Sequence, residues 1–245
     1  MRTLTFLSLV LLLQFPVYCE ANLFNNLYKY SIPEEDFNLQ DDVLLYEIDF
    51  SKYKDGNATK ILKQLGFSFK LDASKIKPVI KESRLFIGDK QGRVAFFVKN
   101  FTFGKATKMS ITWGVSKFTN NEDWENNKQF NSLGLAVSFG TKKFSSGGPF
   151  YYPKMPRFIG YFISKTAKVN KRYLGKYYRK SGRLLCLSNS SNEVTSNINL
   201  VEDFEKHFEG IKYDPITGFA FQVFSKGSNG SLAYIKNIQF FGPSK

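Results

Sequence analysis

Apolar and polar positions alternate through much of the chain. Met109, Ile111, Trp113 and Val115 alternate without exception with small or polar residues. A period of two places these four side chains on one face of a strand, and we expect that face to point into the core. The same alternation predicts further strands over residues 44–50, 93–98, 133–139, 158–164 and 183–187.

Two segments follow a helical pattern instead. Residues 200–208 carry an apolar stripe, with Asn199 in place as N-cap and Glu202 as its capping-box partner. Gly210 is expected to end this helix. A shorter helix is expected between Asn57, as its N-cap, and Gly66.

The last two predicted strands, residues 218–225 and 231–241, flank the glycine-containing loop 226–230 and predict a hairpin. Many short strands with one clear helix favour an all-β fold over an α/β fold. We therefore predict an antiparallel β-sandwich of the jelly-roll or galactose-binding-like type, with one or two short helices. It should form a single domain over residues 43–245, after an extended lead-in over residues 22–42.

The N-terminus has the pattern of a secretory signal peptide over residues 1–21. One arginine precedes a short apolar run from Leu4 to Leu13, and small residues follow. This predicts an exported protein, periplasmic or secreted, cleaved after Cys19 or Ala21. Cys19 has an alternative interpretation as a lipid-attachment site, although Tyr18 replaces the small residue expected before it. Without Cys19, Cys186 is the only cysteine and no internal disulfide can form.

Charge is distributed unevenly along the chain. The sequence holds 35 Lys and Arg against 21 Asp and Glu, for a net charge of +14. Residues 126–192 contain neither Asp nor Glu. The excess of positive charge therefore belongs to one region, and it points to an anionic partner.

The densest part of this region interleaves cations with tyrosines. Such a pattern suits a polyanion, because rings stack on sugar faces while cations meet sulfate, phosphate or carboxylate. The alternative is a solvated hairpin on a lysine-rich protein. The candidate ligand-binding residues here are Lys165, Lys168, Lys171, Arg172, Lys176, Tyr177, Tyr178, Arg179 and Lys180.

Three further aromatic residues are candidates for sugar stacking. Tyr151 and Tyr152 follow Gly-Gly-Pro-Phe in a turn-rich segment, and Trp124 lies in a polar loop. Aromatic plugs at the end of a sandwich are the alternative interpretation of the tyrosines.

Several of these segments together resemble a known family. Residues 111–115, 160–164 and 200–210 and the closing pair of strands are similar, in order and spacing, to the bacterial exported family catalogued as domain of unknown function 3047. The resemblance covers roughly the last 150 residues. It implies an exported β-sandwich of the galactose-binding-like or lectin-like kind, and no established activity. This chain has the single Trp113 where that family tends to show two tryptophans.

Catalytic signatures are sparse. His207 is the only histidine, and Asp203 lies one helical turn before it, so the two are expected to pair as a base with its orienting acid or simply on the helix surface. Serine-hydrolase and zinc-protease signatures are absent, and we predict no cofactor and no metal.

These patterns favour a non-catalytic protein that binds carbohydrate or another anionic component of the cell envelope. One alternative is a polysaccharide lyase that uses Tyr177 or Tyr178, Arg179 and His207. Another is a structural envelope protein that docks on an acidic partner. Nucleic acid fits poorly, because the chain has an export pattern and no nucleic-acid motif. A membrane surface is a further candidate contact, and no oligomeric state is indicated.

Overall fold

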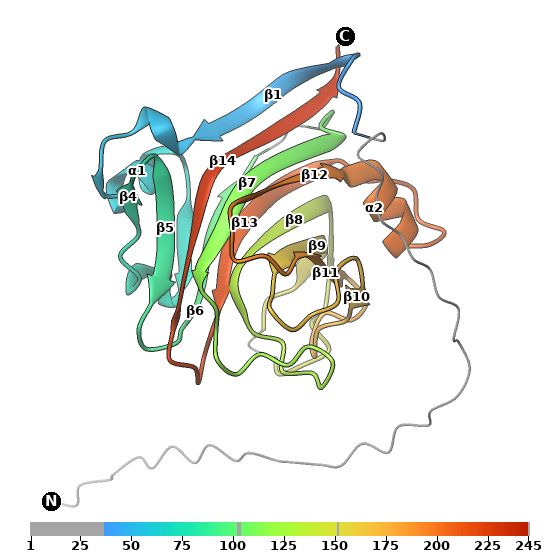
Figure 1. The fold of residues 1–245 in the computed structure, drawn as a ribbon. Helices are drawn as coiled ribbons and strands as arrows, with labels where there is room; N and C mark the ends of the chain where they lie inside the picture. The colour runs from blue at the N-terminus through green and yellow to red at the C-terminus, as the bar shows by residue number, and fades with distance from the viewer. Residues whose placement is uncertain (1–36, 102–103, 151, 245) are drawn as a thin grey trace, which may run out of the picture. The chain divides into compact units, whose positions relative to one another are not determined.

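The computed structural model describes residues 37–101, 104–150 and 152–244. The predicted signal peptide, Cys19 and most of the predicted lead-in lie outside these residues, as does Tyr151. The described residues belong to one unit built from two β-sheets (Figure 1).

The first sheet, sheet A, has the strand order β12-β7-β14-β5-β4-β2. β5 pairs with residues 231–235 of β14, and β1 pairs with residues 237–243 of the same strand. All of its strand pairs are antiparallel. Its strands are β1 (Asp42–Asp49), β2 (Gly56–Asn57), β4 (Val79–Lys81), β5 (Arg84–Asp89), β7 (Lys108–Lys117), β12 (Val194–Asn199) and β14 (Ser231–Pro243).

The second sheet, sheet B, has the order β10-β11-β9-β8-β13-β6-β3. It is antiparallel except for the pair β9 and β11, which run parallel. Its strands are β3 (Ser68–Leu71), β6 (Val94–Asn100), β8 (Asn131–Phe144), β9 (Met155–Ile163), β10 (Arg172–Tyr173), β11 (Gly182–Ser188) and β13 (Ile216–Phe224).

The main core lies between the inner faces of the two sheets. Met109, Ile111, Trp113 and Val115 of β7 are all fully buried, which confirms the predicted core face. Aromatic side chains from opposite sheets meet there: the ring of Phe219 on β13 lies 5.4 Å from that of Phe240 on β14. The predicted fold class, an antiparallel β-sandwich with two short helices, is confirmed.

The predicted helix near residue 200 is confirmed as α2 (Leu200–His207). Asn199 is its N-cap and accepts a hydrogen bond from the Glu202 N–H at 3.2 Å. The first helix, α1 (Thr59–Gln64), starts one residue later than expected, because Ala58 is its N-cap while Asn57 accepts from the Thr59 N–H. Two short 3₁₀ segments, Phe50–Lys52 and Asp72–Ser74, lie outside the predictions.

The predicted hairpin of β13 and β14 is wrong. β13 pairs with β6 and β8 in sheet B, whereas β14 pairs with β1, β5 and β7 in sheet A. The loop 225–230 crosses from one sheet to the other, so the apolar faces of the two strands meet across the core. Alternation alone cannot separate this arrangement from a hairpin, because both place the same side chains inward.

Cys186 is a free, buried thiol. Within the residues that the structure describes, no helix has the length and apolar character needed to cross a bilayer.

Candidate functional site

The basic segment of residues 165–180 is not one unopposed surface. The Nζ of Lys171 lies 2.6 Å from Glu125 Oε2, and Arg172 lies 3.7 Å from Glu209. Both carboxylates come from outside the acid-free stretch. Folding therefore brings acidic side chains next to two of the cations in the first half of the segment.

The loop that carries Glu122 and Glu125 also holds the start of the basic segment in place. Glu122 is buried, and its Oε1 accepts the backbone N–H of Lys165 at 2.6 Å. Burial raises the pKa of the Glu122 carboxyl, and hydrogen bonds from the backbone of Lys165 and from Ser164 partly offset this rise. Lys165 and Lys168 themselves remain exposed on this loop.

Trp124 is buried, contrary to the expectation of an exposed indole. Only 1% of its surface is exposed, and its ring stacks on Phe162 at 3.9 Å with an interplanar angle of 14°. Tyr173 packs against its edge, and Ala167 and Cys186 complete a second, smaller core on the outside of sheet B. The buried indole cannot serve as a sugar platform in this conformation.

Phe162 explains the position of Trp124. The inward residues of β9 are Ile159, Tyr161 and Ile163, so Phe162 points out of the sandwich. An apolar side chain at an outward position requires a cover, and Trp124 provides it. This outward phenylalanine was the sequence signal for a buried Trp124.

Two loops carry the remaining candidates, and the structure brings them together. The N–H of Tyr178 donates to Ser146 O at 2.7 Å, and its hydroxyl donates to Pro153 O at 2.8 Å. The rings of Tyr152 and Tyr177 lie 4.7 Å apart, and both residues are half-buried. Lys176, Arg179 and Lys180 on the second loop are exposed.

The predicted pairing of Asp203 with His207 is wrong. Asp203 Oδ2 accepts the hydroxyl of buried Tyr161 at 3.0 Å, and burial raises the pKa of this carboxyl to about 6. His207 is 8% exposed, and burial, followed by the nearby Lys206, Arg172 and Arg183, lowers its pKa to about 4. Arg183 donates to the backbone oxygens of His207 and Arg179, both at 2.9 Å.

No cluster of three or more His, Cys, Asp or Glu side chains suited to a metal ion occurs among the residues described.

The outer face of sheet B holds a site that the sequence did not indicate. Successive strands place small residues side by side: Ala220 of β13 is opposite Ala136 of β8, and Ala136 is opposite Gly160 of β9. Two residues further along β13, on the same face, Gln222 is opposite Gly134. The centre of this face is therefore a floor of glycine and alanine.

The Gln222 amide lies directly on this floor. A Cβ added to Gly134 would lie 2.6 Å from Gln222 Nε2, and one added to Gly160 would lie 3.6 Å from the same atom. Within the described part of the chain, no protein hydrogen bond reaches this half-buried amide. It can therefore bond a ligand placed on the floor.

Larger side chains border the floor. Phe96 of β6 is opposite Gln222, and Leu184 of β11 lies over Gly160. At the end of β13, Phe224 is 37% exposed and stacks on Phe130 at 5.6 Å with an interplanar angle of 26°. Half-exposed apolar rings thus stand beside a shallow floor, and we call the floor and these rings the sheet B face.

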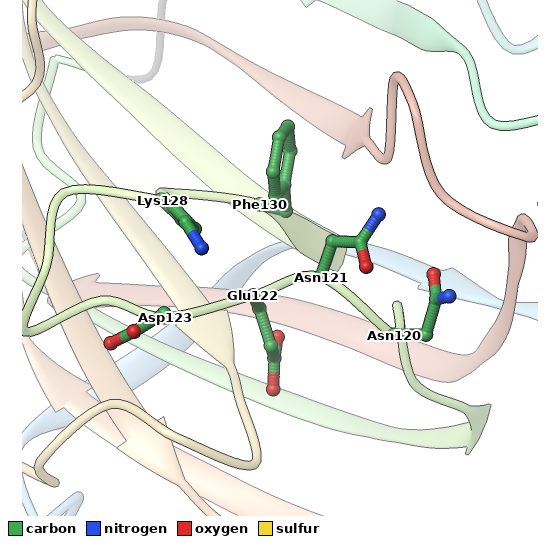
Figure 2. A pocket seen from close by; sticks show the side chains of 6 residues that line it. All are labelled: Asn120, Asn121, Glu122, Asp123, Lys128 and Phe130. Atoms are coloured by element: carbon green, nitrogen blue, oxygen red, sulfur yellow. The ribbon is translucent and has the colours of Figure 1, made fainter.

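An open pocket adjoins the Phe130 edge of the sheet B face. Its volume is about 510 Å³, and all of its lining residues except Phe130 are polar or charged. Figure 2 shows Glu122 and Phe130 pointing to opposite sides, with Asn121 and Asn120 to the right of both in the view. The lining residues are Asn120, Asn121, Glu122, Asp123, Lys128 and Phe130.

The outer face of sheet A differs, because its polar side chains bond one another across strands. The hydroxyls of Thr112 and Thr195 lie 2.9 Å apart, and Ser110 Oγ donates to Asn197 Oδ1 at 2.9 Å. Gln239 likewise donates to Glu47. These groups already have partners, which leaves the sheet B face as the better candidate for a ligand.

No protein-family model matches the chain, and no curated protein matches it in sequence. Solved structures match its fold at low similarity. A family 29 carbohydrate-binding module from Piromyces equi is 10% identical, with a TM-score of 0.36 over 81% of this chain and 91% of that chain. The xyloglucanase domain of a type three effector from Sinorhizobium fredii, in complex with cellobiose, is 9% identical, with a TM-score of 0.36 over 82% and 99%.

A family 12 xyloglucanase from Bacillus licheniformis is 5% identical, with a TM-score of 0.38 over 65% of this chain and 82% of that chain. At such scores the matches carry no argument about function, and the assignment of the fold rests on the sheets themselves.

Proposed function

We propose that this chain binds a carbohydrate on the sheet B face. The observation that carries the proposal is the Gln222 amide, which lies on a glycine floor and has no hydrogen-bond partner among the described residues. The half-exposed rings of Phe96, Phe130 and Phe224 flank it. Sugars present C–H faces that pack on aromatic rings and hydroxyls that bond amides. The sheet B face offers both kinds of contact within one shallow surface.

The adjoining pocket supplies further polar groups. Asn120 uses its Oδ1 to accept from the Asn229 N–H, and Asn121 uses its Nδ2 to donate to Gly227 O. The other half of each amide has no protein partner in the described residues and can meet sugar hydroxyls. Lys128, at the rim, adds a cation for an acidic substituent.

Export and binding without catalysis belong to the same proposal. Export rests on the N-terminal pattern of residues 1–21, and the resemblance to an exported bacterial family agrees with it. Both are predictions, as is an anionic character of the glycan. A periplasmic or secreted location would expose the protein to envelope polysaccharide.

The test is a glycan array followed by calorimetry on the glycans that bind. Phe130→Ala with Phe224→Ala, and separately Gln222→Ala, are expected to weaken binding about tenfold or more, which equals about 1.4 kcal/mol. Phe86→Ala is the matched control, because Phe86 forms a similar half-exposed ring pair with Tyr234 on the outer face of sheet A. Unchanged affinity in both sheet B variants, with normal circular dichroism, would overturn the proposal.

A further inference from the structure

Three arginines lie together at the edge of sheet B that β9, β11 and β10 form. Arg183 of β11 is opposite Ile159, which follows Arg157 on β9 at the next position of the same face. Arg172 of β10 is opposite Leu185, which stands in the same relation to Arg183 on β11. Ile159 and Leu185 belong to the main core, so all three arginines are diagonal neighbours on the core-facing side of the sheet. We call Arg157, Arg172 and Arg183 the arginine cluster.

The end of α2 packs against this edge. The guanidinium carbons of Arg157 and Arg183 lie 5.9 Å and 4.6 Å from the centre of the Phe208 ring. Arg183 Nε donates to His207 O at 2.9 Å, which ties β11 to the last residue of the helix. Burial lowers the pKa of Arg183, and the charges of Arg172 and Arg157 lower it further. The three cations therefore act on one another, and two of them contact the same ring.

Most N–H groups of the arginine cluster have no acceptor among the residues that the structure describes. A guanidinium can donate from Nε and from both Nη atoms. Arg157 donates from none of them, although its Nε is buried. Arg172 makes no hydrogen bond to a described residue either, and Arg183 uses Nε and Nη1 but not Nη2. A buried donor without an acceptor is unfavourable, so the cluster favours an added acceptor.

The acidic side chains near the cluster do not satisfy it. Asp214 lies 3.7 Å from Arg157, and Glu209 lies 3.7 Å from Arg172. Both distances are too long for hydrogen bonds. The side chains of Asp214 and Glu209 are 40% and 81% exposed, so water screens their charges and both can turn towards solvent.

Arg84 of sheet A shows how an arginine is satisfied elsewhere in this fold. Its guanidinium carbon lies 5.0 Å from the centre of the Tyr234 ring, and its Nε donates to Glu193 at 2.8 Å. Arg157 and Arg183 have the same kind of contact with a ring, but within the described residues no carboxylate lies at hydrogen-bonding distance from them.

We propose that the arginine cluster binds a tetrahedral oxyanion, phosphate or sulfate. Arg157, Arg172 and Arg183 would donate to its oxygens, since guanidinium groups bind such oxygens through paired N–H groups. A free ion and an ester group on a glycan present the same oxygens, and the experiment separates these two sources.

This site is independent of the sheet B face. The arginine cluster is on the core-facing side of sheet B, at its edge, whereas the glycine floor with Gln222 is on the outer side. The two sites share no residue, so either proposal can fail while the other holds.

The test is calorimetry of the full chain with sodium sulfate and with sodium phosphate, at an ionic strength kept constant with sodium chloride. Arg157→Gln with Arg172→Gln should weaken the binding of both anions about tenfold or more, and Arg172→Gln alone about threefold. The single variant changes an exposed residue and decides the question if the double variant does not fold. No binding of either anion to the wild type, or unchanged affinity in Arg172→Gln, would overturn the proposal.

Sheet A and its neighbouring loop offer a matched control. Arg84→Gln with Arg93→Gln removes the same net charge from two arginines that pair with Glu193 and Asp89. This variant should bind both anions like the wild type. A loss equal to that of Arg157→Gln with Arg172→Gln would show an effect of net charge only, against the proposal.

Removal of the two nearby acids should have the opposite effect. Glu209→Gln with Asp214→Asn takes away the negative charges that compete with the anion, so affinity should rise about threefold to tenfold. Asp72→Asn with Glu82→Gln makes the same change in net charge at acids that pair with lysines, and it should leave affinity unchanged. An equal rise in both variants would again mean net charge alone and would count against the site.

A sulfated heparin oligosaccharide identifies the source of the anion. Competition between this oligosaccharide and inorganic sulfate, lost in Arg157→Gln with Arg172→Gln, would assign the site to an ester group on a glycan. Binding of the inorganic ions without competition from the oligosaccharide would assign it to a free ion. Both results support the arginine cluster as an oxyanion site.

Discussion

The side chain of Trp124 offers the sharpest test at the scale of single residues. Trp124→Ala removes a fully buried indole from a cluster with Phe162 and Tyr173. We expect the free energy of unfolding to fall by about 3 to 5 kcal/mol, as for large-to-small changes in other cores. Denaturant unfolding measures this loss, and Phe150→Ala, at a 99% exposed position, should change stability by less than about 0.5 kcal/mol. Equal stability of the two variants would contradict the buried position of Trp124.

Gly134 makes a second prediction at this scale. An added Cβ would lie 2.6 Å from Gln222 Nε2 and 2.9 Å from its Cγ, so Gly134→Ala must displace the amide from the floor. Because the proposed ligand contact depends on that amide, glycan affinity should fall about as much as in Gln222→Ala. Calorimetry with an array-selected glycan measures it. Gly104→Ala is the control, since its Cβ would make only an ordinary contact of 3.7 Å with Pro215; a normal affinity in Gly134→Ala would count against the site.

The period of two predicted the inward residues of β7 well, because a strand buried on one face needs apolar residues at every second position. Met109, Ile111, Trp113 and Val115 are inward as expected. The prediction for Trp124 was wrong, because the polar residues around it describe only its own loop. Its burial depends on Phe162, which lies 38 residues later and faces outward from β9.

At the scale of elements, helix α2 holds two groups with opposite pH dependence. Asp203 has a raised pKa of about 6, so between pH of about 4 and 6 the folded chain keeps a proton that the unfolded chain releases. Stability therefore falls as pH rises through that window. His207 has a lowered pKa of about 4, so the unfolded chain holds the extra proton up to a pH of about 6.5, and stability rises with pH.

These opposite slopes give a prediction for paired variants. Asp203→Asn keeps an acceptor for the Tyr161 hydroxyl and removes the contribution of Asp203, which lowers stability as pH rises. The stability of this variant should therefore rise more steeply from pH 4 to 6 than that of the wild type. His207→Gln should show the reverse. Each difference is on the order of 2 kcal/mol across the window. Chemical denaturation at several pH values measures the slopes, and the double variant should run nearly parallel to the wild type. Parallel curves for all four proteins would refute the assignment.

The connection between β13 and β14 shows what local patterns leave undetermined for elements. Phe219, Phe221 and Val223 on one strand, and Ala233 and Ile235 on the other, alternate as a hairpin requires. They alternate equally well when the strands lie in opposite sheets. The choice between these arrangements depends on the pairing of β13 with β6 and β8, and of β14 with β5 and β7. These partner strands lie far earlier in the chain, so no local sequence pattern predicts the pairing.

For the whole molecule, the same reasoning explains which surfaces could be predicted. The uneven charge is visible in the sequence alone, and Lys176, Arg179 and Lys180 of the acid-free stretch are exposed and form no ion pair with the described residues. Folding then added Glu122 and Glu125 to one half of it. The sheet B face escaped prediction because its floor combines small residues from three strands, β8, β9 and β13. Gly134, Gly160 and Ala220 carry no distinctive motif, and only the strand register makes them neighbours.

The two proposed sites, the sheet B face and the arginine cluster, should respond to salt differently. The Debye length falls from about 10 Å at 0.1 M salt to about 3 Å at 1 M, so sulfate binding through the arginine charges should weaken about threefold or more at high salt. Glycan binding through stacking and amide bonds should change less than about twofold.

Calorimetry with an array-selected glycan and with sulfate, at both salt concentrations, measures the two activities on the wild type and on both sets of variants. The Phe130 and Phe224 double variant should lose glycan binding and keep sulfate binding, and the Arg157 and Arg172 double variant should do the reverse. Loss of both activities together in a variant that still folds would mean that the two sites depend on each other. It would contradict their placement on opposite sides of sheet B.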